Sequence, residues 1–255
     1  MKISSYNVNG LRAALRHGLL DWIQQERPEV ICLQETKCTL GQIDRAPLEA
    51  MGYELYLFPA ERRGYSGVAI LSRHQPTSVV YGMGMPLYDR EARLMYIELE
   101  GLCVICVYHP SGSSGAERIA FKLEWLEAFS SFVRGLRQRY RDVVICGDFN
   151  ICHEAIDIHD PVRNARVSGF LPEERAWMTA WFAEGYIDAF RALHPERIAY
   201  SWWSYRTAAR ERNKGWRIDY TILSQSLEGR LLEASIDTEA RHSDHCPISL
   251  VLSEP

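Results

Sequence analysis

The sequence predicts an α/β fold in which two packed β-sheets are flanked by helices. Short apolar runs, typical of buried strands, alternate with segments whose apolar residues recur at helical spacing. The alternation continues through two comparable halves, with no linker, low-complexity tract or short-period repeat. Layers of sheet and helix bury the apolar faces of both kinds of element. With 255 residues, 47% of them hydrophobic, the chain is expected to form one large domain over residues 1–255.

The amino-acid composition argues against several classes of protein but does not identify a binding partner. The net charge of -4 argues against a generally basic nucleic-acid binder. Only four of the 29 basic residues are lysines; this bias towards arginine suits phosphate binding, but codon usage in a GC-rich genome explains it equally well. The seven cysteines are odd in number and mostly lie in apolar runs, so we expect reduced thiols and no zinc site. No apolar stretch or leader pattern indicates membrane insertion or export, so a cytoplasmic protein, in the bacterial cytosol or nucleoid, is expected.

Two strands of the first half end in polar residues. The run 3–10 reads as a strand ending at glycine, and apolar residues at helical spacing follow it as far as Ile23. The run 30–35 is another buried-type strand. Asn7 and Glu35 therefore stand at strand ends, which line the ligand crevice in layered α/β proteins. The alternative for such an acid is a helix cap or a solvated loop residue.

Short β-type runs follow at 67–72, 78–81, 94–99 and 102–108, which predicts a meander-like sheet. The charged turn 88–93 between two of them either presents arginine at the rim of the sheet or is a solvated loop. After Tyr108, the polar loop 109–115 collects hydroxyl groups and backbone donors of the kind that hold phosphates.

The run 143–150 combines an apolar strand with a carboxylate and an amide. A helix over 121–136 precedes it. Residues two apart on an extended backbone face the same way, so Asp148 and Asn150 would share one cleft while Phe149 packs on the other side. The alternative is an Asx-rich turn after a strand.

The second half supplies further polar clusters. The passage 151–169 is long and irregular, which is typical of functional segments, and a helix is expected from Pro172. Aromatic and cationic residues interleave over 200–220, a pattern that suits nucleic acid but also fits core tryptophans followed by a solvated loop. Asp244 and His245 stand immediately before the final apolar strand.

Together these motifs resemble the exonuclease III and apurinic/apyrimidinic (AP) endonuclease family, within the wider endonuclease, exonuclease and phosphatase superfamily. The matching segments span nearly the whole chain in the family's order. They are Asn-Val-Asn-Gly at 7–10, Leu-Gln-Glu-Thr-Lys at 33–37, Gly-Asp-Phe-Asn at 147–150, Gly-Phe-Leu-Pro-Glu-Glu-Arg at 169–175, Gly-Trp-Arg-Ile-Asp-Tyr at 215–220 and Ser-Asp-His-Cys-Pro-Ile at 243–248.

The resemblance implies a four-layer α/β sandwich of two packed mixed β-sheets flanked by helices. It implies a monomeric DNA-repair enzyme that uses Mg²⁺, with Mn²⁺ as a substitute, on double-stranded DNA carrying abasic sites or blocked 3′ ends. Hydrolysis would occur at the phosphodiester 5′ to the abasic site, alongside 3′-phosphodiesterase and 3′→5′ exonuclease activities. The alternatives are a phosphatase of the superfamily, which is not expected to carry the segments at 169–175 and 215–220, and an inactive nucleic-acid-binding relative, which should lack Glu35, Asp148 or His245.

The resemblance also implies roles for individual residues. Asp148 would deprotonate the attacking water, His245 held by Asp219 would donate to the phosphate, and Tyr108 would contact the phosphate or assist the leaving group. The expected catalytic residues are Tyr108, Asp148, Asn150, Asp219 and His245. The expected residues of the metal site are Asn7, Glu35, Asp148, Asn150 and Asp244. The expected substrate-binding residues are Arg93, Ser111, Asn164, Gly169, Trp202, Arg206, Trp216 and Ile218.

Three positions bear on specificity and metal affinity. Ser111 stands where many members carry an asparagine, and Asn9 stands where some have an aspartate. Gly169, which has no side chain, should leave open the mouth of an apolar pocket formed by Trp202, Trp216 and Ile218. An abasic sugar can swing into such a pocket at little stacking cost.

Overall fold

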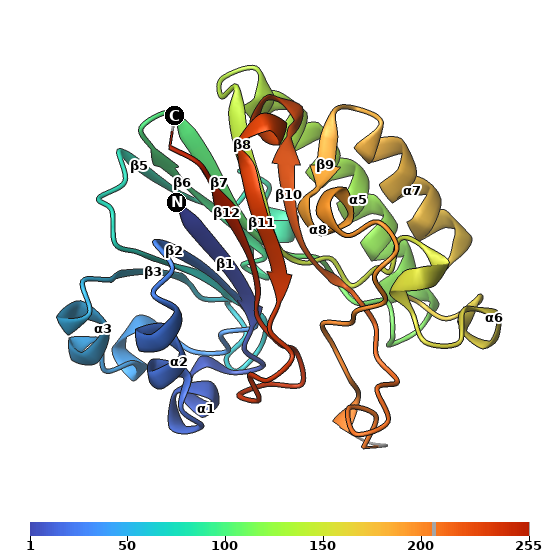
Figure 1. Ribbon diagram of the computed structural model, residues 1–255, viewed down its shortest axis with the longest axis horizontal. Helices are drawn as coiled ribbons and strands as arrows, with labels where there is room; N and C mark the ends of the chain where they lie inside the picture. Colours follow the sequence, from blue (N-terminus) through green and yellow to red (C-terminus); the bar gives the residue numbers. More distant parts are fainter. Residues whose placement is uncertain (206–207, 255) are drawn as a thin grey trace.

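Two six-stranded mixed β-sheets lie face to face in the computed structural model, which describes residues 1–205 and 208–254 (Figure 1). The first sheet has the strand order β11-β12-β1-β2-β4-β3. Its strands are β1 (Lys2–Asn7), β2 (Val30–Gln34), β3 (Glu54–Phe58), β4 (Val68–Ser72), β11 (Leu231–Ile236) and β12 (Ile248–Leu252).

The second sheet has the order β5-β6-β7-β8-β10-β9. Each sheet contains one parallel pair at its centre, β1 with β2 and β7 with β8, and its other pairs are antiparallel. The strands of the second sheet are β5 (Ser78–Tyr81), β6 (Leu94–Leu99), β7 (Leu102–Tyr108), β8 (Asp142–Asp148), β9 (Tyr186–Asp188) and β10 (Asp219–Ser224).

Helices cover the outer faces of both sheets, and this completes the predicted four-layer sandwich (Figure 1). On the first sheet lie α1 (Leu11–Arg16), α2 (Leu19–Glu26) and α3 (Ala46–Ala50), and on the second lie α5 (Ala116–Arg137) and α7 (Pro172–Phe182). The shorter helices are α4 (Pro86–Asp89), α6 (Pro161–Asn164), α8 (Ala189–Leu193) and the 3-10 turns Leu40–Gln42, Ala155–Asp157 and Gln225–Arg230.

Alternation along the central strands builds three apolar layers. In β8, Val144 and Cys146 face the other sheet, whereas Val143 and Ile145 face the helices α5 and α7. Because successive side chains of a strand point to opposite faces, one continuous apolar run can fill two cores at once. All seven cysteines are buried and free, as expected.

The structure departs from the expected elements in two ways. The single helix expected to reach Ile23 is divided by Gly18, which has φ 94°. No strand range was predicted for β3, β9, β10 or β11, and all of these except β10 lie at an edge of their sheet. β9 has only three residues and β11 is interrupted by Glu233, whereas the apolar run of β3 was overlooked. No helix among the described residues is long and apolar enough to cross a membrane.

The central strands end at one common edge. β1, β2, β7 and β8 run to Asn7, Gln34, Tyr108 and Asp148, and the registers place Asn7 opposite Gln34 and Tyr108 opposite Asp148. β10 runs antiparallel to β8 and begins at Asp219, opposite Asp148. The polar residues at these ends therefore converge, although they come from distant parts of the sequence.

Candidate active site

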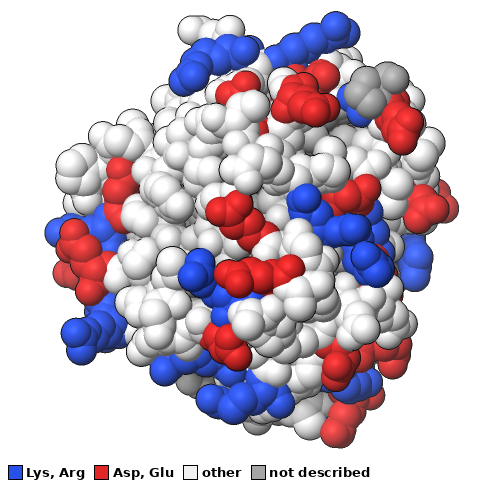
Figure 2. All heavy atoms as spheres, turned by 90° about the vertical axis from the view of Figure 1, so that its left-hand side faces the viewer, with Lys and Arg blue, Asp and Glu red and all other residues white. Residues whose placement is uncertain are grey.

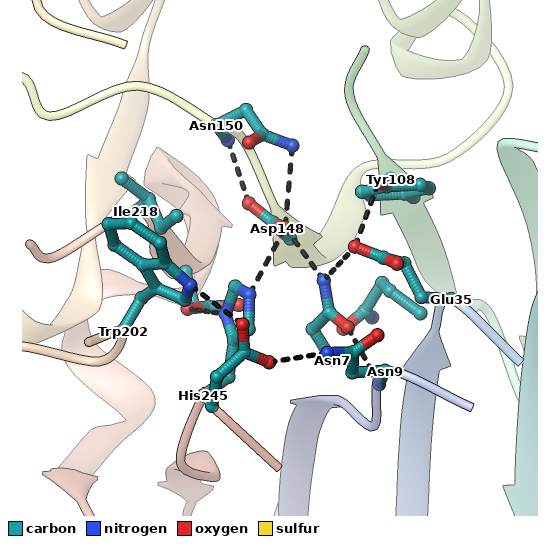
Figure 3. A network of polar contacts seen from close by, with 12 residues as sticks. Asn7, Asn9, Glu35, Tyr108, Asp148, Asn150, Trp202, Ile218 and His245 are labelled. Atoms are coloured by element: carbon teal, nitrogen blue, oxygen red, sulfur yellow. Dashed lines mark hydrogen bonds and ion pairs between the residues drawn. The ribbon is translucent and has the colours of Figure 1, made fainter. Parts of the chain in front are cut away.

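A polar network occupies the edge where the central strands of both sheets end (Figure 3). The side-chain nitrogen of Asn7 donates to Oδ2 of Asp148 at 2.8 Å and to Oε1 of Glu35 at 3.0 Å. The hydroxyl of Tyr108 donates to the same Glu35 oxygen at 2.8 Å. Four residues that were predicted from separate strand ends are thus in direct contact.

Asp148 is the most enclosed carboxylate of this network, with 1% of its surface exposed. The backbone N–H of Asn150 donates to its Oδ1 at 2.8 Å. This local turn needs a left-handed backbone at Asn150 (φ 52°), a conformation that asparagine adopts more readily than most residues. Burial and the neighbouring Asp219 raise the pKa of Asp148, while His245 and Asn7 act in the opposite direction. A carboxylate with a raised pKa is suited to accept a proton near neutral pH.

His245 lies between two carboxylates. Its Nδ1 donates to Oδ2 of Asp219 at 2.8 Å, and its Nε2 lies 3.8 Å from Oδ2 of Asp148. The hydroxyl of Ser201 also donates to Oδ2 of Asp219, at 2.6 Å, and holds that carboxylate in place. Burial opposes the charge on His245, but the charge of Asp219 and its hydrogen bond outweigh burial and raise the pKa of His245 to about 10. The imidazole is therefore protonated at neutral pH: Nδ1–H donates to Asp219, and Nε2–H is a second donor that points towards Asp148 without a hydrogen bond to it.

Glu35, Asp148 and His245 form a group whose nearest ligand atoms all lie within 4.8 Å of one another. A protonated His245 has no free lone pair, which leaves the two carboxylates as metal ligands. Burial tends to raise the pKa of Glu35, but Lys37, whose Nζ lies 2.7 Å from Oε2, and the amide of Asn7 lower it. The carboxylate oxygens of Glu35 and Asp148 are the hard ligands that Mg²⁺ and Mn²⁺ prefer, so the residues present fit such an ion.

The other oxygens predicted to bind metal have protein partners. Asn7 directs its nitrogen at the carboxylates, and its Oδ1 accepts from the N–H of Asn9 at 3.0 Å. Asp244 accepts from Nδ2 of Asn9 at 2.9 Å and from the indole of Trp202 at 3.0 Å. The metal roles of Asn7, Asp244 and Asn150 remain predictions; Oδ1 of Asn7 and Oδ2 of Asp244 each accept one hydrogen bond among the described residues and keep a further lone pair.

The residues of the predicted lesion pocket do lie together beside the network. Trp202 and Trp216 meet edge to face with ring centroids 5.8 Å apart, and both pack on the buried Ile218. The centroid of Trp202 is 6.4 Å from that of His245. At Gly169 (φ 99°), a Cβ atom would lie 2.8 Å from the ring of Trp216. The glycine therefore permits both its own backbone conformation and the position of the indole.

Several arginines expected to contact DNA are placed otherwise. Arg93 was predicted to reach the surface and contact DNA, but only 2% of it is exposed. Its guanidinium donates to the carbonyl of Tyr108 at 3.2 Å and lies over the ring of that residue. Arg217 is equally buried, in contact with Asp157. Arg206 lies outside the described residues. Arg93 pairs with the nearby Glu91 at 2.5 Å, but the contacts that bury it come from Tyr65 and Tyr108. The partners of Arg217 are also distant in sequence, so sequence patterns missed these interior roles.

Two further predicted contacts with substrate are partly exposed, Ser111 on a loop and Asn164 at the end of α6. The hydroxyl of Ser111 donates to Ser113 at 3.0 Å. The side-chain amide of Asn164 donates to the carbonyl of His159, within the passage 151–169, at 2.9 Å. Their binding roles remain predictions.

A basic cavity that sequence reasoning did not find adjoins the site. It has a volume of about 420 Å³ and is lined by Arg12, Lys37, Arg62 and Arg63, among others. Lys37 connects it to Glu35. Its cations are scattered in the sequence and carried no local signal. On the face shown in Figure 2, by contrast, basic and acidic side chains are interspersed.

Comparison with known proteins agrees with this architecture and chemistry. The model of the endonuclease/exonuclease/phosphatase family matches residues 4–245. The chain is 42% identical to an exodeoxyribonuclease of Bacillus subtilis over 99% of its length and all of that protein. It is 38% identical to the DNA repair nuclease APEX1 of Danio rerio, over 99% of this chain and 82% of the relative. An AP endonuclease structure from Archaeoglobus fulgidus superposes with a TM-score of 0.91 and 30% identity, and each chain is covered completely.

Proposed function

The chain belongs to the endonuclease/exonuclease/phosphatase family, and we propose that it is a metal-dependent DNA-repair nuclease that hydrolyses the phosphodiester 5′ to an abasic site. We include 3′-phosphodiesterase and 3′→5′ exonuclease activities in the proposal, because the relatives comprise an exodeoxyribonuclease as well as AP endonucleases. One observation carries the choice of substrate: Asp148 and His245 lie next to the apolar cluster that contains Trp202, Trp216 and Ile218, which we take as the wall of the lesion pocket.

Asp148 is the base of this mechanism. Its raised pKa allows it to take a proton from a water molecule as that water attacks phosphorus. The amide of Asn150, whose Nδ2 donates to the carbonyl of His109 at 2.9 Å, is fixed beside it and orients the nucleophile. Attack in line with the bond to the 3′ oxygen leaves a 3′-hydroxyl and a 5′-deoxyribose phosphate.

His245 and Tyr108 act on the phosphate. Nδ1–H of His245 is bonded to Asp219, which leaves Nε2–H to donate to a non-bridging oxygen whose charge grows in the transition state. Burial and the charge of Glu35 hold the pKa of the Tyr108 phenol well above its usual range, so the phenol remains a hydrogen-bond donor. A divalent ion held by Glu35 and Asp148 would neutralise charge on the phosphate and on the leaving oxygen.

The lesion is selected by shape. An abasic sugar has no base to unstack and can enter the space beside Trp202 and Trp216, whereas an intact nucleotide is too large. Because Asp219 follows Ile218 directly, the pocket floor and the residue that orients His245 belong to one segment. The residue that selects the lesion and the residue that aligns the phosphate through His245 are thus neighbours on one backbone segment.

Three end-labelled duplexes test the proposal: one with an internal abasic site, one with a blocked 3′ end and one intact. With Mg²⁺ present, the abasic duplex should be cut fastest and the intact 3′ end degraded most slowly. Equal rates on the abasic and intact duplexes would contradict the role given to the pocket. We also propose that the enzyme acts as a monomer in the cytosol or nucleoid; sedimentation with and without DNA tests the monomer.

A further inference from the structure

A fully buried ion pair connects the catalytic loop to the lesion pocket. Nζ of Lys122, on α5, lies 2.6 Å from Oε1 of Glu174, on α7, and neither side chain has any exposed surface. Removing two charges from water is costly, and a buried ion pair by itself is weak evidence for stability. The contacts that surround this pair indicate what else it does.

Lys122 binds the catalytic loop. Its ammonium donates to the backbone carbonyl of Asn150 at 2.7 Å. Asn150 has a left-handed backbone (φ 52°), and its own N–H and side-chain amide both contact Asp148. The hydrogen bond from Lys122 fixes the peptide plane that follows Asn150. The orientation of the Asn150 amide towards Asp148 therefore depends on a residue that does not touch substrate.

Glu174 binds the segment that borders the pocket. Its Oε2 accepts from the backbone N–H of Gly169 at 2.6 Å and from that of Leu171 at 3.0 Å. The carbonyl of Gly169 accepts from the N–H of Cys152, two residues beyond Asn150, at 2.7 Å. Gly169 is thus held from both sides while it lies against Trp216.

We propose that Lys122 and Glu174 are positioning residues for the reaction: the pair fixes Asn150 against Asp148 and, through Gly169, fixes the distance between the catalytic loop and the Trp216 side of the lesion pocket. The inference rests on the proposed function. Its physical reason is that misplacing a reacting group by about 1 Å can cost on the order of 100-fold in rate. An apolar side chain at either position would fill space but could not hold a carbonyl or an N–H group in place.

The test compares variants that leave no unpaired charge. In the double variant Lys122→Met/Glu174→Met both charges and the acceptor oxygens of Glu174 are lost, whereas Lys122→Arg retains the cation and can keep the pair. The matched control is Lys2→Met/Glu26→Met, which removes another Lys–Glu contact of 2.6 Å that is remote from the site. kcat and KM are measured on the abasic duplex well below the Tm of every variant, with active enzyme titrated.

We expect kcat of the double variant to fall about 10- to 100-fold with KM nearly unchanged, the control to match wild type, and Lys122→Arg to recover part of the loss. The proposal would be overturned if the double variant had a lower Tm but a kcat within about threefold of wild type. That result is expected if the ion pair only stabilises the fold. If the double variant does not fold, Lys122→Met/Glu174→Gln, which also leaves no unpaired charge, is judged by the same criterion.

Hydrogen exchange separates this proposal from the proposed function. The N–H of Gly169 should be protected in wild type and should lose protection in the double variant, whichever DNA the enzyme cleaves. A wild type that leaves abasic DNA intact would refute the proposed function alone. Unchanged protection of Gly169 in the double variant would refute the positioning role alone.

Discussion

Replacing Gly169 by alanine tests whether the pocket selects abasic DNA. Gly169 has φ 99°, where a side chain strains the backbone, and a Cβ there would lie 2.8 Å from the ring of Trp216 and 3.2 Å from the carbonyl oxygen of Asn150. Since comfortable carbon contacts begin at about 3.5 Å, the indole must move by roughly 1 Å. The substitution therefore acts on the wall of the pocket without introducing a polar group.

The expected loss of stability follows from the strained backbone at position 169 and from the close contacts of the added Cβ. A left-handed backbone costs a non-glycine residue about 1–2 kcal/mol, and crowding a packed site costs about 1–3 kcal/mol. The lower entropy of an unfolded chain with alanine offsets about 0.4–1 kcal/mol. The net loss is about 1–5 kcal/mol, and for a chain of this size it lowers Tm by roughly 2–20 °C.

The assay measures two rates and a Tm. Well below the Tm, cleavage of the abasic duplex should fall about tenfold or more because Trp216 is displaced, while trimming of an intact 3′ end falls less. Gly135→Ala is the matched control: Gly135 is exposed within α5, with no heavy atom near the added Cβ, so Tm should rise slightly and both rates should stay constant. Equal losses of both activities in Gly169→Ala would refute the pocket as the source of selectivity.

Three further expectations concern the chemistry, DNA binding and pH. Asp148→Asn, His245→Ala or addition of a chelator should each lower abasic cleavage by several orders of magnitude, and near-normal turnover in any of them would contradict the mechanism. DNA affinity should fall steeply with salt, and Arg62→Ala should reduce the log–log slope by about 1; a slope unchanged from wild type would exclude the basic cavity from the DNA interface. Burial holds the pKa of His109 well below its usual value, and its ring nitrogens have no hydrogen-bond partner among the described residues. Below about pH 6.5 the unfolded chain therefore takes up a proton on His109 that the folded chain does not. The free energy of unfolding should fall by up to about 1.4 kcal/mol per pH unit as the pH drops. In denaturation experiments across this range, the free energy of unfolding of His109→Phe should depend less steeply on pH than that of wild type.

The sequence alone determined the layers of the fold and the residues that gather at the candidate active site. Asn7, Glu35 and Asp148 each end or follow an apolar run, and strand ends can be read from local patterns. The parallel pairs β1–β2 and β7–β8 then bring those ends to one edge. The meeting of these three residues therefore follows from the direction of their strands and could be predicted, and the structure shows them in contact.

Tertiary structure alone decided which residues face solvent and which partner each charged group finds. Arg93 looked like a surface cation because its neighbours in sequence are charged, yet it packs over Tyr108 in the interior. The edge strands β9 and β11 were missed because pairing with a neighbouring strand, and not their own apolar pattern, defines them. Lys122 and Glu174 stand 52 positions apart, on two helices that both pack against the second sheet. Their burial and pairing arise from contacts between distant segments, and no local pattern encodes such contacts.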